Sequence, residues 1–203
     1  MKTKMDIHNH HIVIRHSIRE KITDVNDSYR QLLTPEGIEL AKQLGKVFSL
    51  HSDNFTFYYS PVPRCEQTAF SIKEGIESQN KKVSNVVSFE PLGGFFNRNF
   101  KSIADLCHQS GHHQYLQMWY ENKVSPDIVM PCSEAANFMF NEITNTNHEN
   151  ITKVFITHDW NLFCLQSLFK KSVKEMEVPN YLEGIIISKD KLKFTPFKQE
   201  NFM

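Results

Sequence analysis

No run of about 18 apolar residues, the minimum for a membrane-spanning helix, occurs in this sequence of 203 residues. The first ten residues, MKTKMDIHNH, also lack the apolar segment of a signal peptide. We therefore expect a cytoplasmic protein with no membrane partner.

Closely spaced cysteine pairs are missing as well. The four cysteines lie far apart in the chain and form no CxxC motif: Cys65, Cys107, Cys132 and Cys164. This spacing fits neither a disulfide framework nor a structural zinc site, and it is typical of reduced intracellular thiols.

The chain has no excess of charge of either sign, because 23 Lys and Arg residues balance 23 Asp and Glu residues. Proteins that bind nucleic acid broadly need a basic surface that neutralises several phosphates. The balance disfavours a nucleic-acid partner, but it is compatible with a small cationic pocket.

The length and the alternation of apolar segments favour one α/β domain over residues 1–203, with no tandem repeat or linker. β-branched and aromatic runs predict strands over 11–14, 55–59, 83–89, 151–157, 185–188 and 192–197, the last two as a hairpin with one strand at the sheet edge. Helices are expected from 35 to 48 with Thr34 as N-cap, from 63 to 78, over 133–143 with Ser133 as N-cap, and through 163–169. Strands that alternate with helices indicate a sheet covered on both faces.

A cluster of cationic residues follows the first predicted strand. Arg15, His16, Ser17, Ile18 and Arg19 come directly after the apolar run 11–14. In an open α/β sheet, the carboxyl ends of the strands border the ligand site. Guanidinium groups match phosphate oxygens bidentately, and a histidine held between them can attack phosphorus. This stretch therefore predicts a phosphoryl-binding site with a nucleophile.

Charged residues and a histidine also follow two later predicted strands. The strand at 55–59 runs into Ser60-Pro61 and then Arg64, which begins a helix, and a helix N-terminus favours an anion. His158 and Asp159 directly follow the strand at 151–157. We expect both segments to reach the same edge of the sheet as the first motif.

These three blocks, in this order, resemble the histidine phosphatase superfamily, whose signature Arg-His-Gly-x-Arg stands here as Arg15 to Arg19 with Ser17 in place of glycine. The resemblance implies a three-layer α/β/α sandwich of the phosphoglycerate mutase type, with a mostly parallel sheet and a cap insertion at about 95–131. It also implies that His16 is the nucleophile. The groups expected around the transferred phosphoryl group are Arg15, Arg19, Arg64 and His158. Serine restricts the φ > 0 conformations that glycine allows.

The resemblance offers two carboxyl groups as the general acid. Asp159 directly follows the second histidine, as in the acid phosphatase branch, and it is the preferred acid. Glu90, after the strand at 83–89 and ahead of Gly93, is the alternative, since many phosphoglycerate mutase-like members carry a glutamate there. Either group would need a pKa raised above about 4 to donate at neutral pH.

The function implied is that of a metal-independent phosphomonoesterase that acts on a phosphorylated small molecule through a phosphohistidine intermediate. No cofactor or metal is required, because arginines supply the positive charge. A phosphoglycerate mutase-like phosphotransferase is the alternative, but it needs extra cations in the cap, where the main ones are Arg98, Lys101 and Lys123. The sequence leaves the natural substrate and the oligomeric state open.

Two other classes of function remain open. Asp6, His8 and His10, with His158 as a further ligand, form a pattern that a metal-dependent hydrolase could use. The second class is a phosphate-binding module without catalytic activity. Such a module would not need a nucleophile like His16. In the cap, His112 and His113 are adjacent and face different directions, so we expect no shared metal there. The aromatic residues of the insertion fit either an active-site cap or a separate small core.

Overall fold

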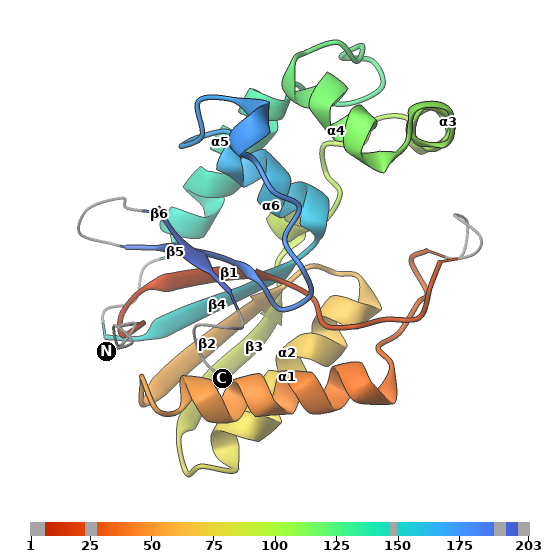
Figure 1. Cartoon of the computed structure of the whole chain (residues 1–203). Helices are drawn as coiled ribbons and strands as arrows, with labels where there is room; N and C mark the ends of the chain where they lie inside the picture. The colour runs from red at the N-terminus through yellow and green to blue at the C-terminus, as the bar shows by residue number, and fades with distance from the viewer. Residues whose placement is uncertain (1–6, 23–27, 147–149, 189–193, 199–203) are drawn as a thin grey trace.

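The computed structural model describes residues 7–22, 28–146, 150–188 and 194–198 (Figure 1). The strands are β1 (His11–Arg15), β2 (Asn54–Tyr59), β3 (Lys82–Ser88), β4 (Thr152–Thr157), β5 (Gly184–Ile187) and β6 (Phe194–Phe197). The helices are α1 (Pro35–Phe48), α2 (Pro63–Glu77), α3 (Phe100–Ser110), α4 (His112–Tyr120), α5 (Cys132–Thr144) and α6 (Asp159–Gln166). The described residues also contain the 3₁₀ turns η2 (Glu90–Leu92) and η3 (Val173–Glu175).

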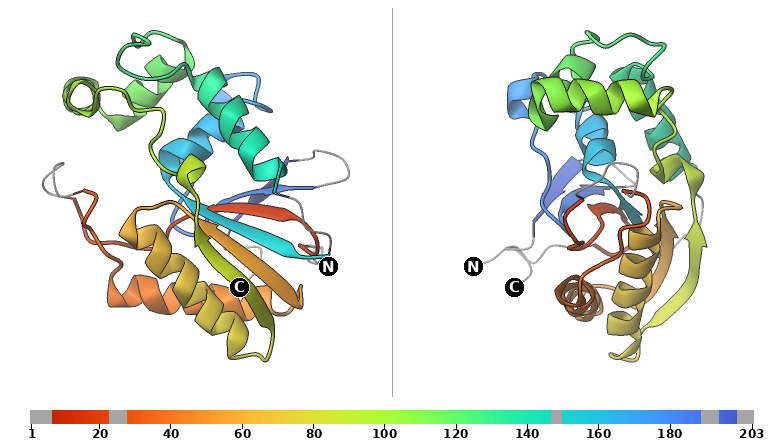
Figure 2. Two further views of the ribbon diagram at one scale, coloured as in Figure 1. Left: turned by 180° about the vertical axis from the view of Figure 1, so that it is seen from behind. Right: turned by 90° about the vertical axis from the view of Figure 1, so that its right-hand side faces the viewer.

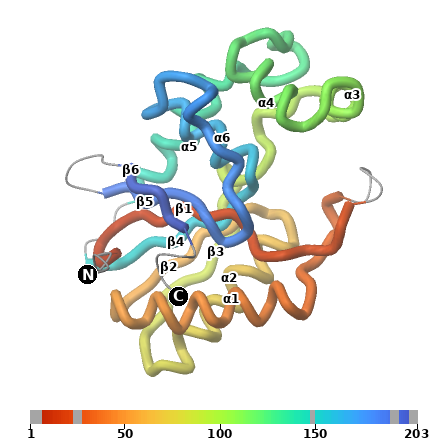
Figure 3. The backbone as a smooth tube through the Cα atoms, viewed as in Figure 1, coloured from red at the N-terminus to blue at the C-terminus, as the bar shows by residue number. Residues whose placement is uncertain are grey.

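The strands form one mixed sheet in the order β3-β2-β4-β1-β5-β6. β3, β2, β4 and β1 run parallel to one another, whereas β5 pairs antiparallel with β1 and β6 antiparallel with β5. The backbone trace shows β1 and β4 side by side in the middle of the sheet (Figure 3). Because Ile156 of β4 pairs with both Ile14 and Tyr59, the carboxyl ends of β1, β2 and β4 meet at one edge. The predicted mostly parallel sheet and the edge hairpin are confirmed, and residue 192 lies outside the described residues.

Helices cover both faces of the sheet, with α1 and α2 on one side and α5 and α6 on the other (Figures 1 and 2). Side chains of β1 alternate between the two cores: Ile12 and Ile14 pack in the cluster of α1 and α2, and Val13 packs in the cluster of α5 and α6. The three-layer α/β/α architecture predicted from the sequence is confirmed.

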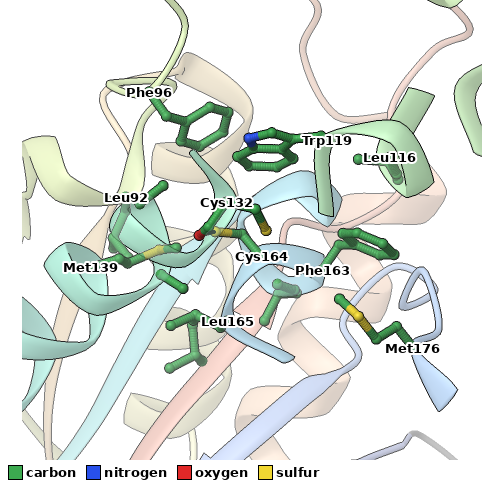
Figure 4. Packing of buried hydrophobic residues seen from close by; sticks show 14 of the residues in the cluster. Leu92, Phe96, Leu116, Trp119, Cys132, Met139, Phe163, Cys164, Leu165 and Met176 are labelled. Carbon is green, nitrogen blue, oxygen red and sulfur yellow. Dashed lines mark hydrogen bonds between the residues drawn. The ribbon is translucent and has the colours of Figure 1, made fainter. Parts of the chain in front are cut away.

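The insertion between β3 and α5 contains α3 and α4, which lie beyond the end of the sheet (Figure 1). Its aromatic residues do not form a separate core. Phe96, Tyr115 and Trp119 belong to the same buried cluster as Phe155 of β4, and the rings of Phe96 and Trp119 lie 4.9 Å apart (Figure 4). The insertion is therefore anchored on the helical layer that also carries α6.

Two predicted helix ends are wrong. α5 begins at Cys132 with Pro131 in the N-cap position in place of Ser133, because Pro131, with φ −49° and ψ 136°, turns the chain into the helix two residues earlier, and no side chain caps it. α6 ends at Gln166, since the amides of Leu168 and Phe169 bond carbonyls three residues back in a tighter turn. By contrast, Thr34 caps α1 as predicted, and its side chain accepts from the Gly37 amide. In the described part of the chain, no helix is long and apolar enough to cross a membrane.

Candidate active site

The three cationic motifs meet at the shared edge of β1, β2 and β4. The His16 amide donates to the Thr157 carbonyl over 2.9 Å, and the Ser60 amide donates to the Ile156 carbonyl over 2.9 Å. These backbone bonds extend the parallel ladder by one residue beyond the strands. They bring the segments after β1 and β2 alongside the end of β4, as the sequence predicts.

His16 is buried, and the surroundings of its ring select one tautomer. Its Nδ1 donates to the Ser17 carbonyl at 2.8 Å, and its Nε2 accepts from Nε of Arg64 at 3.0 Å. Burial, the neighbouring His158 and the charge of Arg64 lower the pKa of His16 well below its ordinary value of 6.5. The ring is therefore neutral at physiological pH, with the lone pair on Nε2.

Ser17, which stands where the superfamily signature has glycine, fixes the loop that carries His16. Its hydroxyl donates to the Gly37 carbonyl at 2.6 Å, and its amide donates to Oγ1 of Thr68 at 3.0 Å. A Cβ on Gly37 would lie 2.1 Å from the Ile18 carbonyl oxygen, so only glycine lets α1 approach the loop this closely. Ser17 is not one of the described residues with positive φ. The backbone here does not need a glycine, and the serine supplies an additional tether.

Arg64 joins the two histidines. It is the second residue of α2, after Pro63, and its side chain points from the helix start into the site. While Nε donates to His16, Nη2 donates to Nδ1 of His158 at 3.2 Å and Nη1 donates to the Ser28 carbonyl at 2.7 Å. One guanidinium thus holds both rings and a loop carbonyl in a fixed geometry.

His158 is also neutral. Since its Nδ1 accepts from Arg64, its Nε2 carries the proton and donates to the Ser60 hydroxyl at 2.9 Å. Burial and, next, the charge of Arg64 lower the pKa of His158 to about 3, although Asp159 opposes this effect. Positive charge around the site accordingly comes from the arginines, and His158 contributes as a neutral ring.

Arg15 and Asp159 form an ion pair with 2.7 Å between Nη2 and Oδ2. Arg15 also donates through Nη1 to the Pro179 carbonyl at 2.8 Å, and its guanidinium lies 4.4 Å from the centre of the Tyr181 ring. The other oxygen of Asp159 accepts from the Trp160 amide at 3.0 Å. Asp159, the preferred acid, therefore lies beside one of the three arginines expected to bind phosphate.

Two guanidinium N–H groups in the site have no acceptor among the residues that the structure describes. Nη1 of Arg19 donates to the Glu20 carbonyl at 2.7 Å. Nε of Arg15 and Nε of Arg19 are both buried, and neither has a hydrogen-bond partner within the described residues. Buried polar groups almost always have a partner, and one left without costs about 1–3 kcal/mol. An anion that accepts from these groups would remove that cost.

Glu90, the alternative acid, is not bonded to this cluster in the described residues. It is the first residue of η2 and is exposed. Over residues 7–22, 28–146, 150–188 and 194–198 its carboxylate makes no hydrogen bond or ion pair with the two histidines or three arginines. Of the seven residues predicted for the site, the structure brings together His16, His158, Asp159 and the three arginines.

The alternative metal site is divided between two ends of the sheet. The carbonyl of His10 accepts from the Lys153 amide at the start of β4, whereas His158 follows the end of β4. Five strand residues separate these levels by about 16 Å, so His8 and His10 cannot share an ion with His158. Asp6 lies outside the described residues, and in the described ranges no group of three His, Cys, Asp or Glu side chains could hold a metal.

Sequence reasoning missed two residues of the site. Ser60, whose hydroxyl accepts from His158, lies in the Ser-Pro turn that follows β2. That turn is the sequence signal that could have indicated its place in the site. Tyr181 contacts Arg15, and its ring centre lies 5.6 Å from that of His16. It precedes β5, far from the three motifs in the chain, and no local pattern marks it.

No family model matches the chain, and no curated protein matches it. Solved structures do. A mycobacterial glucosyl-3-phosphoglycerate phosphatase is 12% identical, with a TM-score of 0.58 over 93% of this chain and 97% of that one. A protein described as mycobacterial hydrolase 1 is 11% identical, with a TM-score of 0.61 over 93% and 96%. A phosphoserine phosphatase mutant from Entamoeba histolytica, solved with phosphoserine, is 17% identical, with a TM-score of 0.59 over 96% and 99%.

These structural similarities extend over nearly the whole chain. At such low sequence identity they establish the fold only. The chain shares the phosphoglycerate mutase-like α/β fold of these solved structures, which is the fold that the resemblance of its three motifs implies.

Proposed function

We propose that this protein is a metal-independent phosphatase that hydrolyses phosphomonoesters through a phosphohistidine on His16. The observation that carries the proposal is the state of His16: a neutral ring whose Nδ1 is occupied by the Ser17 carbonyl and whose Nε2 is the basic nitrogen, next to Arg64. A phosphate-binding module has no need for a nucleophile prepared in this way. The phosphatases among proteins of the same fold support the same class of reaction.

In the first step, Nε2 of His16 attacks phosphorus, and the bond from phosphorus to the ester oxygen breaks. Arg15, Arg19 and Arg64 bind the equatorial oxygens, so the buried N–H groups of Arg15 and Arg19 gain acceptors in the transition state. The phosphoryl group also competes with Asp159 for Arg15. Once protonated, Asp159 gives its proton to the leaving alcohol.

In the second step, water attacks the phosphohistidine. Asp159 accepts a proton from that water, the bond from nitrogen to phosphorus breaks, and inorganic phosphate leaves. His16 returns to the neutral tautomer with its proton still on Nδ1. Asp159 is preferred over Glu90 because it contacts Arg15, whereas Glu90 is exposed.

The cap favours hydrolysis over a mutase reaction. A mutase must hold a second phosphate with cations outside the catalytic cluster, and two of the cap cations are already engaged. Lys123 pairs with Glu121 at 2.6 Å, and Arg98 donates to the Pro126 carbonyl at 2.7 Å. We propose a phosphorylated small molecule as the substrate class.

Turnover should not depend on a divalent metal. We expect the purified protein to release phosphate from p-nitrophenyl phosphate at the same rate with and without excess EDTA, because arginines supply the charge that a metal supplies in other phosphatases. Phosphate release is measured before and after dialysis against the chelator. Loss of activity with EDTA, restored by a metal ion, would contradict the proposed function.

The acid limb of the pH profile should lie below pH 6.5. His16 reacts only when Nε2 is unprotonated, and burial lowers its pKa, so the active form persists as the pH falls through the ordinary histidine value of 6.5. We expect kcat/KM, calculated for one ionic form of the ester, to stay level between about pH 7 and pH 6. If kcat/KM instead fell with the protonation of an enzyme group whose pKa is near 6.5, His16 would not be in the environment described.

A further inference from the structure

We propose that His112, in the cap, is a positioning residue for the general acid Asp159 and acts through Trp160. This inference rests on the proposed function, since it assigns a role in the same reaction.

The cap reaches the catalytic edge through one helix face. His112 is the first residue of α4, and its Nε2 accepts the indole N–H of Trp160, with 5.4 Å between the ring centres. Three residues along α4, on the same face, the ring of Tyr115 lies 5.0 Å from that of Trp160 at 33°. Tyr115 is fully buried in the core, whereas His112 is exposed. Tyr115 thus packs against the Trp160 ring, and His112 makes the directional hydrogen bond to the Trp160 indole.

Trp160 connects this contact to the reacting groups. Its amide donates to Oδ1 of Asp159 at 3.0 Å, and Oδ2 of Asp159 pairs with Arg15. Partial desolvation lowers the pKa of His112, the carboxylate of Asp159 raises it, and Arg15 and His113 lower it. The imidazole therefore lies within electrostatic range of Asp159 and Arg15, and it is neutral at physiological pH, as an acceptor for the indole must be.

Asp159 is partly exposed in its ion pair, with 21% of its side chain accessible, so packing alone does not fix its carboxylate. The bond to His112 limits rotation of the Trp160 side chain next to it. Loss of that bond should misplace the acid and spare the nucleophile, because no described contact links His112 to His16.

This role predicts an effect that depends on the leaving group. Esters of weakly acidic alcohols need a proton from Asp159, while p-nitrophenolate leaves without one. For His112→Ala we expect kcat/KM to fall about tenfold with an alkyl phosphate and to change less than twofold with p-nitrophenyl phosphate. His112→Gln, which offers an amide oxygen near the position of Nε2, should restore most of the alkyl phosphate activity. His113→Ala, at the adjacent exposed position, is the matched control and should leave both rates unchanged.

The partner of His112 is tested by a double-mutant cycle. Trp160→Phe keeps the aromatic ring and removes the indole N–H, so it should reproduce the loss of His112→Ala, and the double variant should lose nothing more. Equal losses with both esters, or additive losses in the cycle, would overturn the proposal, since they would indicate a general structural role.

A separate readout does not require turnover. The chain has two tryptophans, so NMR should show two indole N–H resonances, and Trp160→Phe assigns one of them. His112→Ala should move that resonance upfield as the hydrogen bond is lost, whereas His113→Ala should not. An unmoved resonance would overturn the inference. In another outcome, the wild-type protein hydrolyses neither ester while His112→Ala moves the resonance as expected. That result would contradict the proposed function and the positioning role of His112 in it, and it would uphold the contact between His112 and Trp160.

Discussion

Replacement of His16 by alanine is expected to lower kcat for phosphomonoester hydrolysis by about 10⁴-fold or more. The variant removes Nε2, the only protein atom that bonds to phosphorus in the proposed mechanism. The three arginines and His158 remain, so substrate should still bind. Steady-state kinetics with p-nitrophenyl phosphate and a binding measurement with inorganic phosphate separate the two effects.

His16→Asn is the companion variant, because its side-chain amide can replace Nδ1 as the donor to the Ser17 carbonyl without offering a nucleophile. It should be as inactive as His16→Ala, even where the alanine variant is less stable. His10→Ala, at the opposite end of β1, is the matched control and should retain full activity. Residual turnover in both His16 variants would exclude His16 as the nucleophile and return attention to the other histidines.

Arg64→Lys should lower kcat/KM by about 10³-fold although it conserves charge. The guanidinium of Arg64 donates in three directions, to His16, His158 and the Ser28 carbonyl. A single ammonium cannot reach all three groups and a phosphoryl oxygen as well. Kinetics across a range of substrate concentrations would measure the loss.

Arg98→Lys serves as the control for Arg64→Lys. Arg98 is exposed in the cap insertion and donates to a backbone carbonyl, so the same substitution there should leave kcat/KM within about twofold of wild type. If Arg64→Lys were equally mild, Arg64 would act only as a nearby positive charge, and the geometric role assigned to it would be wrong.

The convergence of the three motifs could be predicted from the sequence because each follows a strand, and parallel strands end at the same edge of a sheet. β1 and β4 are apolar runs with abrupt polar ends, so their boundaries were clear. Thr34 and Pro35 likewise marked the start of α1 by local chemistry. In these segments, local propensity and the tertiary fold require the same structure.

Contacts between distant segments could not be predicted in this way. The Tyr181 ring reaches Arg15 from a loop before β5, and the indole of Trp160 reaches His112 in the cap. The neutral state of His158 depends on burial and on Arg64, neither of which is visible at the position of His158 in the chain. The sequence analysis assigned no helices to the cap, although Phe100, Ile103 and Leu106 of α3 have the spacing of a one-sided apolar helix face, which could have indicated that helix.

The phosphoenzyme itself tests the central claim most directly. A substrate mixed briefly with the protein and quenched with base should leave one phosphate on His16, since phosphohistidine survives base and is lost in acid, and peptide mass spectrometry locates it. We expect this adduct in wild type and in His10→Ala, and none in His16→Asn. A phosphate on any other residue, or sustained turnover without an adduct on His16, would contradict the mechanism.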